Sequence, residues 1–141
     1  MHEVRGCLLN GKGGERMPEL RMEPVSRYGV RLFVGGCVER GDGSSFRRRA
    51  HAHVVGQHKG WICIRSWRRI LGSTGRPSRL IWHEVAHCLV GPSNWHNRAW
   101  DRMRLKLIRE NLKAPVFSRD EIEQACASAI KTEAIGEAQT Q

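Results

Sequence analysis

The segment His83-Glu84-Val85-Ala86-His87 constrains the fold of this chain more than any other feature. Residues four apart on an α-helix lie on one face, so both imidazoles of this spacing can reach the same metal ion. Zinc accepts neutral imidazole nitrogens at about 2.0–2.1 Å. Glu84, beside the first ligand, is then close to the metal without binding it, where it can take a proton from a metal-activated water and deliver it to a leaving amine. The motif predicts a helix that carries a catalytic zinc ion.

The residues around the motif support this prediction. Pro77-Ser78 is a start signal for a helix and Gly91-Pro92 is a stop signal, so the helix is expected to end shortly after His87. His96 follows near the start of the next element and is the expected third ligand, with Asp101 or another acid as the alternative. Three protein ligands leave the fourth corner of a tetrahedron open for water, as a catalytic zinc site requires.

Short β-type segments are expected before this helix. Alternating apolar residues predict a strand over 28–34, and a Gly-Asp-Gly-Ser turn signal predicts that this strand forms a hairpin with a returning strand in 47–56. The aromatic and β-branched segment 61–64 is the strongest strand candidate, and 66–71 is expected to form a short helical turn. Residues 1–25 are rich in glycine and charge without a sustained period, so we expect a flexible arm there.

Two more helices are expected after the motif. One begins near Ser93, a plausible N-cap, and runs to about Lys113. The other begins at Ser118, which forms a capping box with Glu121, and it carries an apolar stripe at helical spacing made of Ile122, Ala125, Cys126, Ala129 and Ile130. This stripe packs either on its own domain or on a partner. The predicted organisation is a flexible arm over 1–25, a catalytic domain over 26–117, and a C-terminal amphipathic helix and tail over 118–141.

The charge of the chain suggests a nucleic-acid partner. The 141 residues carry a formal net charge of +10, and the segment 44–83 contains no acidic residue. A basic surface of this kind attracts phosphate backbones, although it also serves solubility alone. The residues expected to contact DNA are Arg47, Arg48, Arg49, Arg65, Arg68 and Arg69. No run approaches the roughly 18 apolar residues of a membrane helix, and no signal-peptide core is visible, so we expect a cytoplasmic protein without membrane contact.

The cysteines and the remaining histidines carry no recognisable metal motif. Five cysteines are present, an odd number without a C-x-x-C pair, so neither a disulfide framework nor a cysteine-based zinc knuckle is expected. We interpret them as small buried apolar residues. His51, His53 and His58 are expected on strands or at the surface, and one of them is an alternative hydrogen-bond donor to the transition state.

At His83, Glu84, His87, His96 and Trp100 the sequence resembles the SprT-like zinc metallopeptidases, the family that includes Spartan. Members of this family carry H-E-x-x-H on a helix, a short turn, and a third histidine followed by an aromatic residue four positions on. The resemblance implies that His83, His87 and His96 bind zinc, that Glu84 is the catalytic acid and base, and that Trp100 packs behind the third ligand.

The resemblance also implies an α+β, zincin-like fold in which a small, mainly antiparallel sheet packs against the metal-bearing helices. In such folds the strand before the helix can pair with an extended peptide substrate, which here would be Trp61–Arg65. Small single-domain members occur in bacteria and phages, so the expected location is the cytoplasm, that of the host if the chain is phage-encoded.

The leading hypothesis is therefore a zinc-dependent endopeptidase that cleaves extended polypeptide, with DNA-associated protein as one candidate substrate. The alternative is a basic nucleic-acid-binding module whose metal site is structural or vestigial. An HNH-type nuclease, prompted by His87, Asn94 and His96, is disfavoured because the segment is predicted to be helical. A zinc deaminase is disfavoured because no P-C-x-x-C motif is present.

Overall fold

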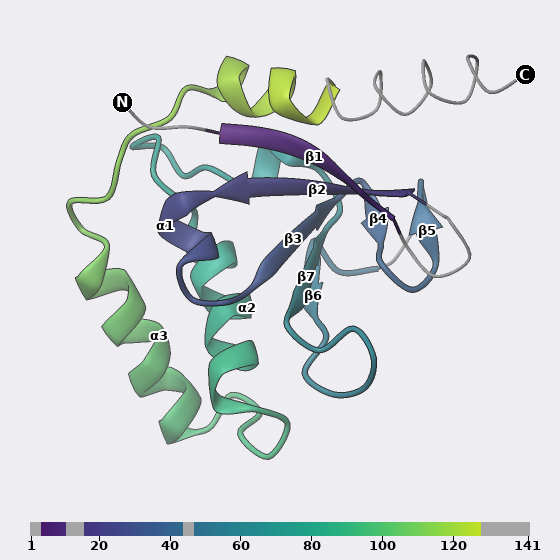
Figure 1. Ribbon diagram of the computed structural model, residues 1–141. Coiled ribbons are helices and arrows are strands. Elements are labelled where there is room, and N and C mark those ends of the chain that lie inside the picture. The colour runs from purple at the N-terminus through teal and green to yellow at the C-terminus, as the bar shows by residue number, and fades with distance from the viewer. Residues whose placement is uncertain (1–3, 11–15, 44–46, 128–141) are drawn as a thin grey trace, which may run out of the picture.

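A computed structural model describes residues 4–10, 16–43 and 47–127 (Figure 1). The strands are β1 (Val4–Asn10), β2 (Arg16–Met22), β3 (Arg31–Val34), β4 (Gly36–Cys37), β5 (Gly41–Asp42), β6 (Ala50–Ala52) and β7 (Trp61–Ile64). The helices are α1 (Glu23–Ser26), the 3₁₀ helix η2 (Trp67–Arg69), α2 (Arg79–Val90) and α3 (Arg98–Glu110). A further helix begins at residue 119 and continues to at least residue 127.

A five-stranded sheet in the order β1-β2-β3-β7-β6 is the centre of the molecule, and β4 pairs with β5 in a separate two-stranded sheet. The predicted α+β class is confirmed. The sheet is mainly antiparallel, as expected, and the exception is the pair β3 and β7, which is parallel from Arg31↔Trp61 to Val34↔Ile64. Parallel neighbours need a long crossover connection, and residues 35–60 form it. The predicted hairpin between the strands in 28–34 and 47–56 is wrong, since β6 pairs with β7 rather than with β3.

The prediction of a flexible arm over 1–25 is wrong for the described residues of that segment. Strands β1 and β2 pair in antiparallel register from Val4↔Met22 to Asn10↔Arg16. Leu20 and Met22 of β2 are buried in the core. The alternation of apolar and charged residues in this strand is short and is interrupted by Pro18, a residue that argues against a strand. One of the charged residues, Glu19, is itself buried and forms two hydrogen bonds to the Arg31 guanidinium at 2.8 and 3.2 Å.

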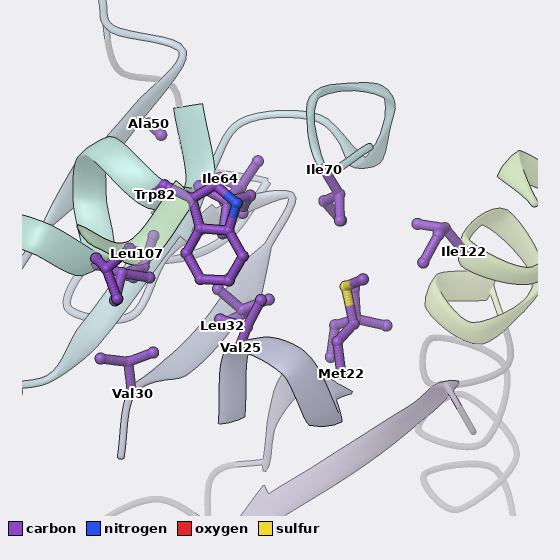
Figure 2. Close-up of a cluster of buried hydrophobic side chains, with 14 of the residues drawn as sticks. Met22, Val25, Val30, Leu32, Ala50, Ile64, Ile70, Trp82, Leu107 and Ile122 are labelled. Atoms are coloured by element: carbon purple, nitrogen blue, oxygen red, sulfur yellow. The ribbon is translucent and has the colours of Figure 1, made fainter. Parts of the chain in front are cut away.

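The main core lies between the sheet and the helices (Figure 2). Helix α2 contributes Ile81, Trp82, Val85 and Ala86, which all lie on its buried face. These side chains pack with sheet residues that include Leu32, Ile62 and Ile64. Burial of each large apolar side chain contributes about 1.5–3 kcal/mol. Because one face of α2 is fixed in this way, the motif residues on the adjoining face point in a defined direction.

Both ends of α2 agree with the sequence prediction. The Ser78 hydroxyl accepts a hydrogen bond from the backbone N–H of Ile81 at 3.4 Å, and it donates one to the carbonyl of Arg69 at 2.7 Å. Gly91 ends the helix with φ 82°, a conformation that favours glycine. Its N–H donates to the carbonyl of His87 at 3.0 Å. Helix α3, in contrast, begins after the N-cap Asn97 and not after Ser93 as expected, so residues 91–97 form a loop.

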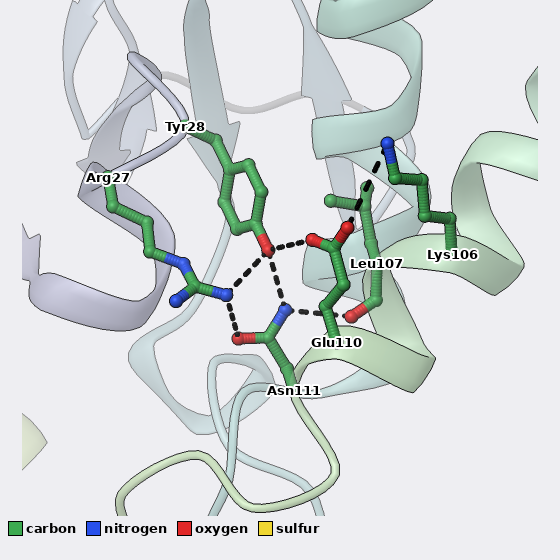
Figure 3. Close-up of polar contacts among 6 residues, drawn as sticks. All are labelled: Arg27, Tyr28, Lys106, Leu107, Glu110 and Asn111. Atoms are coloured by element: carbon green, nitrogen blue, oxygen red, sulfur yellow. Dashed lines mark hydrogen bonds and ion pairs between the residues drawn. The ribbon is translucent and has the colours of Figure 1, made fainter.

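A polar network fastens the end of α3 to the turn before β3 (Figure 3). The Tyr28 hydroxyl donates to the Glu110 carboxylate at 2.8 Å and accepts from the Asn111 amide at 2.9 Å. The Arg27 guanidinium donates to Asn111 Oδ1 at 3.2 Å, and the Asn111 amide also donates to the carbonyl of Leu107 at 2.7 Å. This network fixes the C-terminal end of α3. The first turn of α3 packs beside α2.

The C-terminal helix begins with the predicted capping box. The backbone N–H of Glu121 donates to the Ser118 hydroxyl at 3.1 Å, and the N–H of Ser118 donates to the Glu121 carboxylate at 3.0 Å. Ile122 is buried in the same core as Met22 of β2 (Figure 2), and Ala125 also belongs to this core. The described part of the apolar stripe thus packs on its own domain, while residues 129 and 130 lie outside the described residues. None of the described helices is long and apolar enough to cross a membrane.

Candidate metal centres

Helix α2 presents His83 and His87 on one face, one turn apart. Their ring centroids are 4.9 Å apart. His96 approaches from the loop after the helix, and its Nε2 lies 3.1 Å from Nε2 of His83. One nitrogen from each of the three rings lies within 4.8 Å of the others. The structure therefore brings together the three predicted ligands, which we call the three-histidine centre.

The loop that carries His96 is held by its own side chains. The Asn94 amide donates to the carbonyl of Val90 at 2.9 Å, and the Asn97 amide donates to Asn94 Oδ1 at 2.9 Å. Asn97 Oδ1 accepts from the backbone N–H of Trp100 at 3.1 Å and so caps α3. Among the described non-glycine residues, His96 is the one with a positive φ, at 50°. Such a conformation costs about 1–3 kcal/mol and is typical of functional positions.

The three-histidine centre fits a metal ion. Nε2 of His87 is buried and has no hydrogen-bond partner among the described residues, and an unsatisfied buried polar atom costs about 1–3 kcal/mol. A tetrahedral ion with Zn–N bonds of about 2.0–2.1 Å separates its nitrogens by roughly 3.3 Å. The 3.1 Å between the His83 and His96 nitrogens is close to this value. A metal ion would satisfy both His87 and the close pair of imidazoles.

Two tryptophans enclose the three-histidine centre. The rings of His87 and Trp95 are stacked with centroids 4.5 Å apart, and Trp100 lies 4.6 Å from His96 and 4.8 Å from His83. The Trp100 indole N–H donates to the carbonyl of His83 at 3.2 Å. Trp100 is buried, while Trp95 is 56% exposed. Trp100 thus packs behind the ligands, as the resemblance implies, and Trp95 forms an exposed apolar wall.

Glu84 is buried beside the ligands. Its Oε1 lies 3.7 Å from Nε2 of His83, and burial raises the pKa of the Glu84 carboxyl to about 7. Burial, followed by the charges of His83 and His96, lowers the pKa of His87 to about 4. Burial also lowers the pKa of His83. At neutral pH the imidazoles of His83 and His87 are therefore in the neutral form that binds metal, and Glu84 can both accept and release a proton.

Arg48 belongs to this centre although sequence analysis assigned it only to a basic patch. Its guanidinium carbon lies 5.5 Å from the centroid of the Trp95 ring. Its positive charge opposes the rise in the pKa of Glu84 and lowers the pKa of His83 and His87. The side chain is exposed and precedes β6. Nothing in the Arg47-Arg48-Arg49 run distinguishes the middle residue, so the sequence alone gives no signal for this role.

The strand expected to pair with a peptide substrate is in the wrong place for that role. Strand β7 lies between β3 and β6, and all four of its residues are buried. The edge strand next to β7 is β6, and β6 contacts α2. The six arginines expected to contact DNA are exposed, in 47–49 before β6 and at Arg65, Arg68 and Arg69.

A second group of possible metal ligands consists of Cys37, His51, His53 and Cys63, which we call the Cys–His cluster. One ligand atom from each residue lies within 4.8 Å of the others. Cys37 comes from β4, His51 from β6 and Cys63 from β7, where it pairs with His51 in the sheet register. His53 follows β6, and its Nε2 lies 3.3 Å from Sγ of Cys63 and 3.6 Å from Sγ of Cys37. Burial raises the pKa of Cys63 to about 12.

Cys37 and Cys63 are buried, as expected, but the structure also brings them together with two histidines in the Cys–His cluster. This cluster forms a possible metal site that sequence analysis missed, because its ligands come from three separate strands. The one available signal was the spacing His51-Ala52-His53, which places two imidazoles on the same side of a strand. His58, the third histidine of this region, faces Glu39, with Nδ1 3.6 Å from Oε1.

Two hollows are described in the surface. One of about 330 Å³ opens beside His83 and is lined by Arg79, Leu80, His83, Trp100 and Arg104. Another of about 870 Å³ lies between the β2–β3 region and residues 110–117, away from both groups of ligands. Of these two hollows, the first adjoins a group of possible metal ligands.

Comparisons with known proteins identify no relative whose site could be compared with these two groups of ligands. No family model, no curated protein and no solved structure matches the chain.

Proposed function

We propose that this protein is a zinc-dependent endopeptidase of the SprT-like type. The observation that supports the proposal best is the convergence of His83, His87 and His96 around a buried, unpartnered Nε2 of His87, with the buried carboxyl of Glu84 beside them. Three imidazoles are a zinc ligand set that keeps one position open. An adjacent carboxyl that titrates near neutral pH suits proton transfer during hydrolysis.

In this proposal His83, His87 and His96 hold the zinc ion. When bound, zinc would supply Lewis-acid chemistry, acidifying a water molecule and polarising the carbonyl of the substrate. Glu84 takes a proton from the attacking water at its carboxylate and later delivers it to the leaving amine. Its burial raises the pKa to about 7 and so makes both transfers accessible at neutral pH.

Arg48 and Trp95 have supporting roles in the proposal. The Arg48 guanidinium, close enough to influence the pKa of Glu84, stabilises negative charge that develops on the substrate. Trp95 is exposed and apolar at the rim of the centre, so it suits contact with a substrate side chain.

The proposed substrate is an extended polypeptide that adds to the outer edge of β6. Strand β6 is the end strand of the sheet and contacts α2. Two of its three residues are alanines, so the strand offers little steric hindrance. Strand addition gives affinity through main-chain hydrogen bonds and is largely independent of sequence. The exposed arginines of 47–49 precede this edge and favour acidic or DNA-bound polypeptide substrates.

The test is the variant Glu84→Gln, which keeps the size of the side chain and removes its ability to carry the proton. We expect a loss of peptidase activity of about 10²–10⁴-fold with an unchanged zinc content. Glu123→Gln on the C-terminal helix, where the side chain is exposed, is the matched control and should keep full activity. Peptidase activity of Glu84→Gln equal to that of the wild type would exclude this mechanism.

A second candidate function, nucleic-acid binding, is favoured by the segment 44–83, which has no acidic residue, and by the exposure of the six arginines expected to contact DNA. Phosphate contacts release counterions, so DNA affinity should fall steeply between low and physiological salt. Fluorescence anisotropy with labelled DNA measures this dependence. Affinity that does not change with salt would exclude a phosphate-binding surface. The two functions are compatible, since DNA binding would deliver a peptidase to DNA-bound protein.

A further inference from the structure

The Cys–His cluster lies outside the proposed peptidase centre and is built differently. Cys37 is 3% and Cys63 is 0% exposed, and His51 and His53 are half-buried. We propose that Cys37, His51, His53 and Cys63 bind a second zinc ion, one with a structural role. Two thiolates and two imidazoles are a common ligand set of structural zinc sites. Four protein ligands close the coordination sphere, so no position is left for water or substrate.

The distances within the cluster agree with tetrahedral zinc. Zn–S bonds of about 2.3 Å and Zn–N bonds of about 2.0–2.1 Å separate a sulfur from a nitrogen by roughly 3.5 Å. Nε2 of His53 lies 3.3 Å from Sγ of Cys63 and 3.6 Å from Sγ of Cys37. The ring centroids of His51 and His53 are 4.9 Å apart, and all four ligand atoms lie within 4.8 Å of one another.

The groups around the ligands are those expected around zinc. Glu39 Oε1 lies 3.3 Å from Nδ1 of His53, on the side of the ring opposite the sulfurs. A carboxylate at this position fixes the tautomer and the orientation of a zinc-binding histidine. The backbone N–H of Val38 donates to Sγ of Cys63 at 3.3 Å, which stabilises a thiolate. These contacts orient His53 and Cys63 toward one point.

A metal ion at the Cys–His cluster would stabilise a part of the fold that has little hydrophobic packing of its own. Among the described residues, the small hydrophobic cluster on this side of the sheet consists of Phe33, Cys37, Val38, Trp61 and Cys63. Strands β4 and β6 are two and three residues long. The proposed zinc ion would be held by residues of β4, β6 and β7 and by the residue that follows β6. It would join the short strands β4 and β6 to the central sheet.

A disulfide between Cys37 and Cys63 is the competing explanation for the proximity of the two sulfurs. It gives no reason for two imidazoles to converge on the same point, nor for Glu39 to orient His53. Zinc explains all four side chains together, and the experiment below separates the two explanations.

The test uses the full chain, purified under reducing conditions, and begins with metal analysis. We expect about two zinc ions per chain in the wild type, one for each group of ligands. Cys63→Ser should retain about one, and so should His96→Ala. Cys126→Ser, which changes a cysteine outside both groups, is the matched control and should retain about two.

Cobalt substitution identifies the ligands without relying on variants that fail to fold. Cobalt(II) bound to thiolate gives a near-ultraviolet charge-transfer band, which an all-histidine site lacks. We expect this band in the wild type and in His96→Ala, so the result is independent of the peptidase proposal. Absence of the band in reduced wild-type protein that binds cobalt would overturn the second site. So would a Cys37–Cys63 disulfide in protein prepared without oxidant.

Discussion

The three-histidine centre and the Cys–His cluster use related ligands in contrasting surroundings. The first is formed by adjacent turns of one helix and by a strained loop residue, next to an exposed tryptophan and a buried carboxyl. The second is formed by three strands, with both thiols buried and a carboxylate that orients one imidazole. The comparison teaches that the number and exposure of the ligands, more than their chemical type, distinguish the open site proposed for catalysis from the closed site proposed for a structural role.

Loss of a ligand should affect stability very differently at the two sites. Cys63→Ser removes a fully buried ligand that joins three strands, so we expect the unfolding free energy to fall by more than about 4 kcal/mol, since binding at structural zinc sites contributes about 10–16 kcal/mol. His96→Ala changes an exposed loop residue and leaves the positive φ unrelieved, because alanine also disfavours it, but it removes no buried contact, so its effect should be below about 2 kcal/mol. Urea unfolding of the zinc-loaded proteins measures both. Equal losses of unfolding free energy in Cys63→Ser and His96→Ala would contradict this difference between the two sites.

The pH dependence of zinc-free protein should depend on Glu84. Folding raises the pKa of this carboxyl from 4.5 to about 7, so the folded state keeps a proton that the unfolded state releases between these values. Its contribution to stability is complete below pH 4.5 and is lost as pH rises through 7. Glu84→Gln does not titrate, so it should be more stable than the wild type at pH 8, by up to about 3 kcal/mol.

Near pH 4.5 the unfolding free energies of Glu84→Gln and wild type should converge. His87 acts in the opposite direction in both proteins, because its pKa is lowered from 6.5 to about 4 and its contribution is lost as pH falls through this range. Thermal unfolding of the two proteins between pH 4.5 and 8 makes the measurement. A stability difference that is constant across this range would contradict the buried, proton-carrying role of Glu84.

Glu39→Gln should weaken only the Cys–His cluster. The carboxylate orients His53, and loss of such a partner typically lowers metal affinity 10–100-fold. Competition with a chromogenic chelator on the His96→Ala background, where only the second site holds zinc, measures the change directly. Glu110→Gln, which alters a carboxylate in the network of Figure 3, should leave this affinity unchanged. An equal effect of both variants would mean that Glu39 does not act on the metal.

Arg48→Ala should have the smallest effect of the four and should affect only the three-histidine centre. The guanidinium influences the pKa of Glu84 from an exposed position, where solvent screens its charge, so we expect a roughly tenfold fall in kcat/KM. Arg47→Ala removes the neighbouring exposed arginine and is the matched control. If both variants lose activity equally, and lose it less at high salt, the basic run attracts substrate as a whole.

The features that sequence analysis predicted correctly are those encoded by neighbouring residues. Spacing alone places His83 and His87 on one face of α2, and Ser78 and Gly91 mark its ends. The capping box at Ser118 and Glu121 is equally local. These features follow from backbone geometry within one or two turns, so they need no knowledge of the rest of the fold.

The features that sequence analysis missed depend on contacts between distant segments. Strand β3 pairs with β7 across residues 35–60, and no turn signal reports such a pairing. The Cys–His cluster depends on that arrangement, since Cys37 and Cys63 come together only when β4 and β7 are neighbours. Sequence analysis predicted that helix α3 begins near Ser93, but it begins after the N-cap Asn97. Side-chain hydrogen bonds of Asn94 and Asn97 stabilise a loop before it.

The left-handed backbone of His96 also determines which residues could replace it during evolution or design. Among non-glycine residues, asparagine, aspartate and histidine occupy this conformation most readily, and β-branched residues are excluded from it. Of these three, histidine and aspartate are good zinc ligands. The loop therefore accepts an exchange of histidine for aspartate with little backbone cost. Such an exchange would change the net charge of the centre by one unit, giving this fold a single-residue route to a different metal preference.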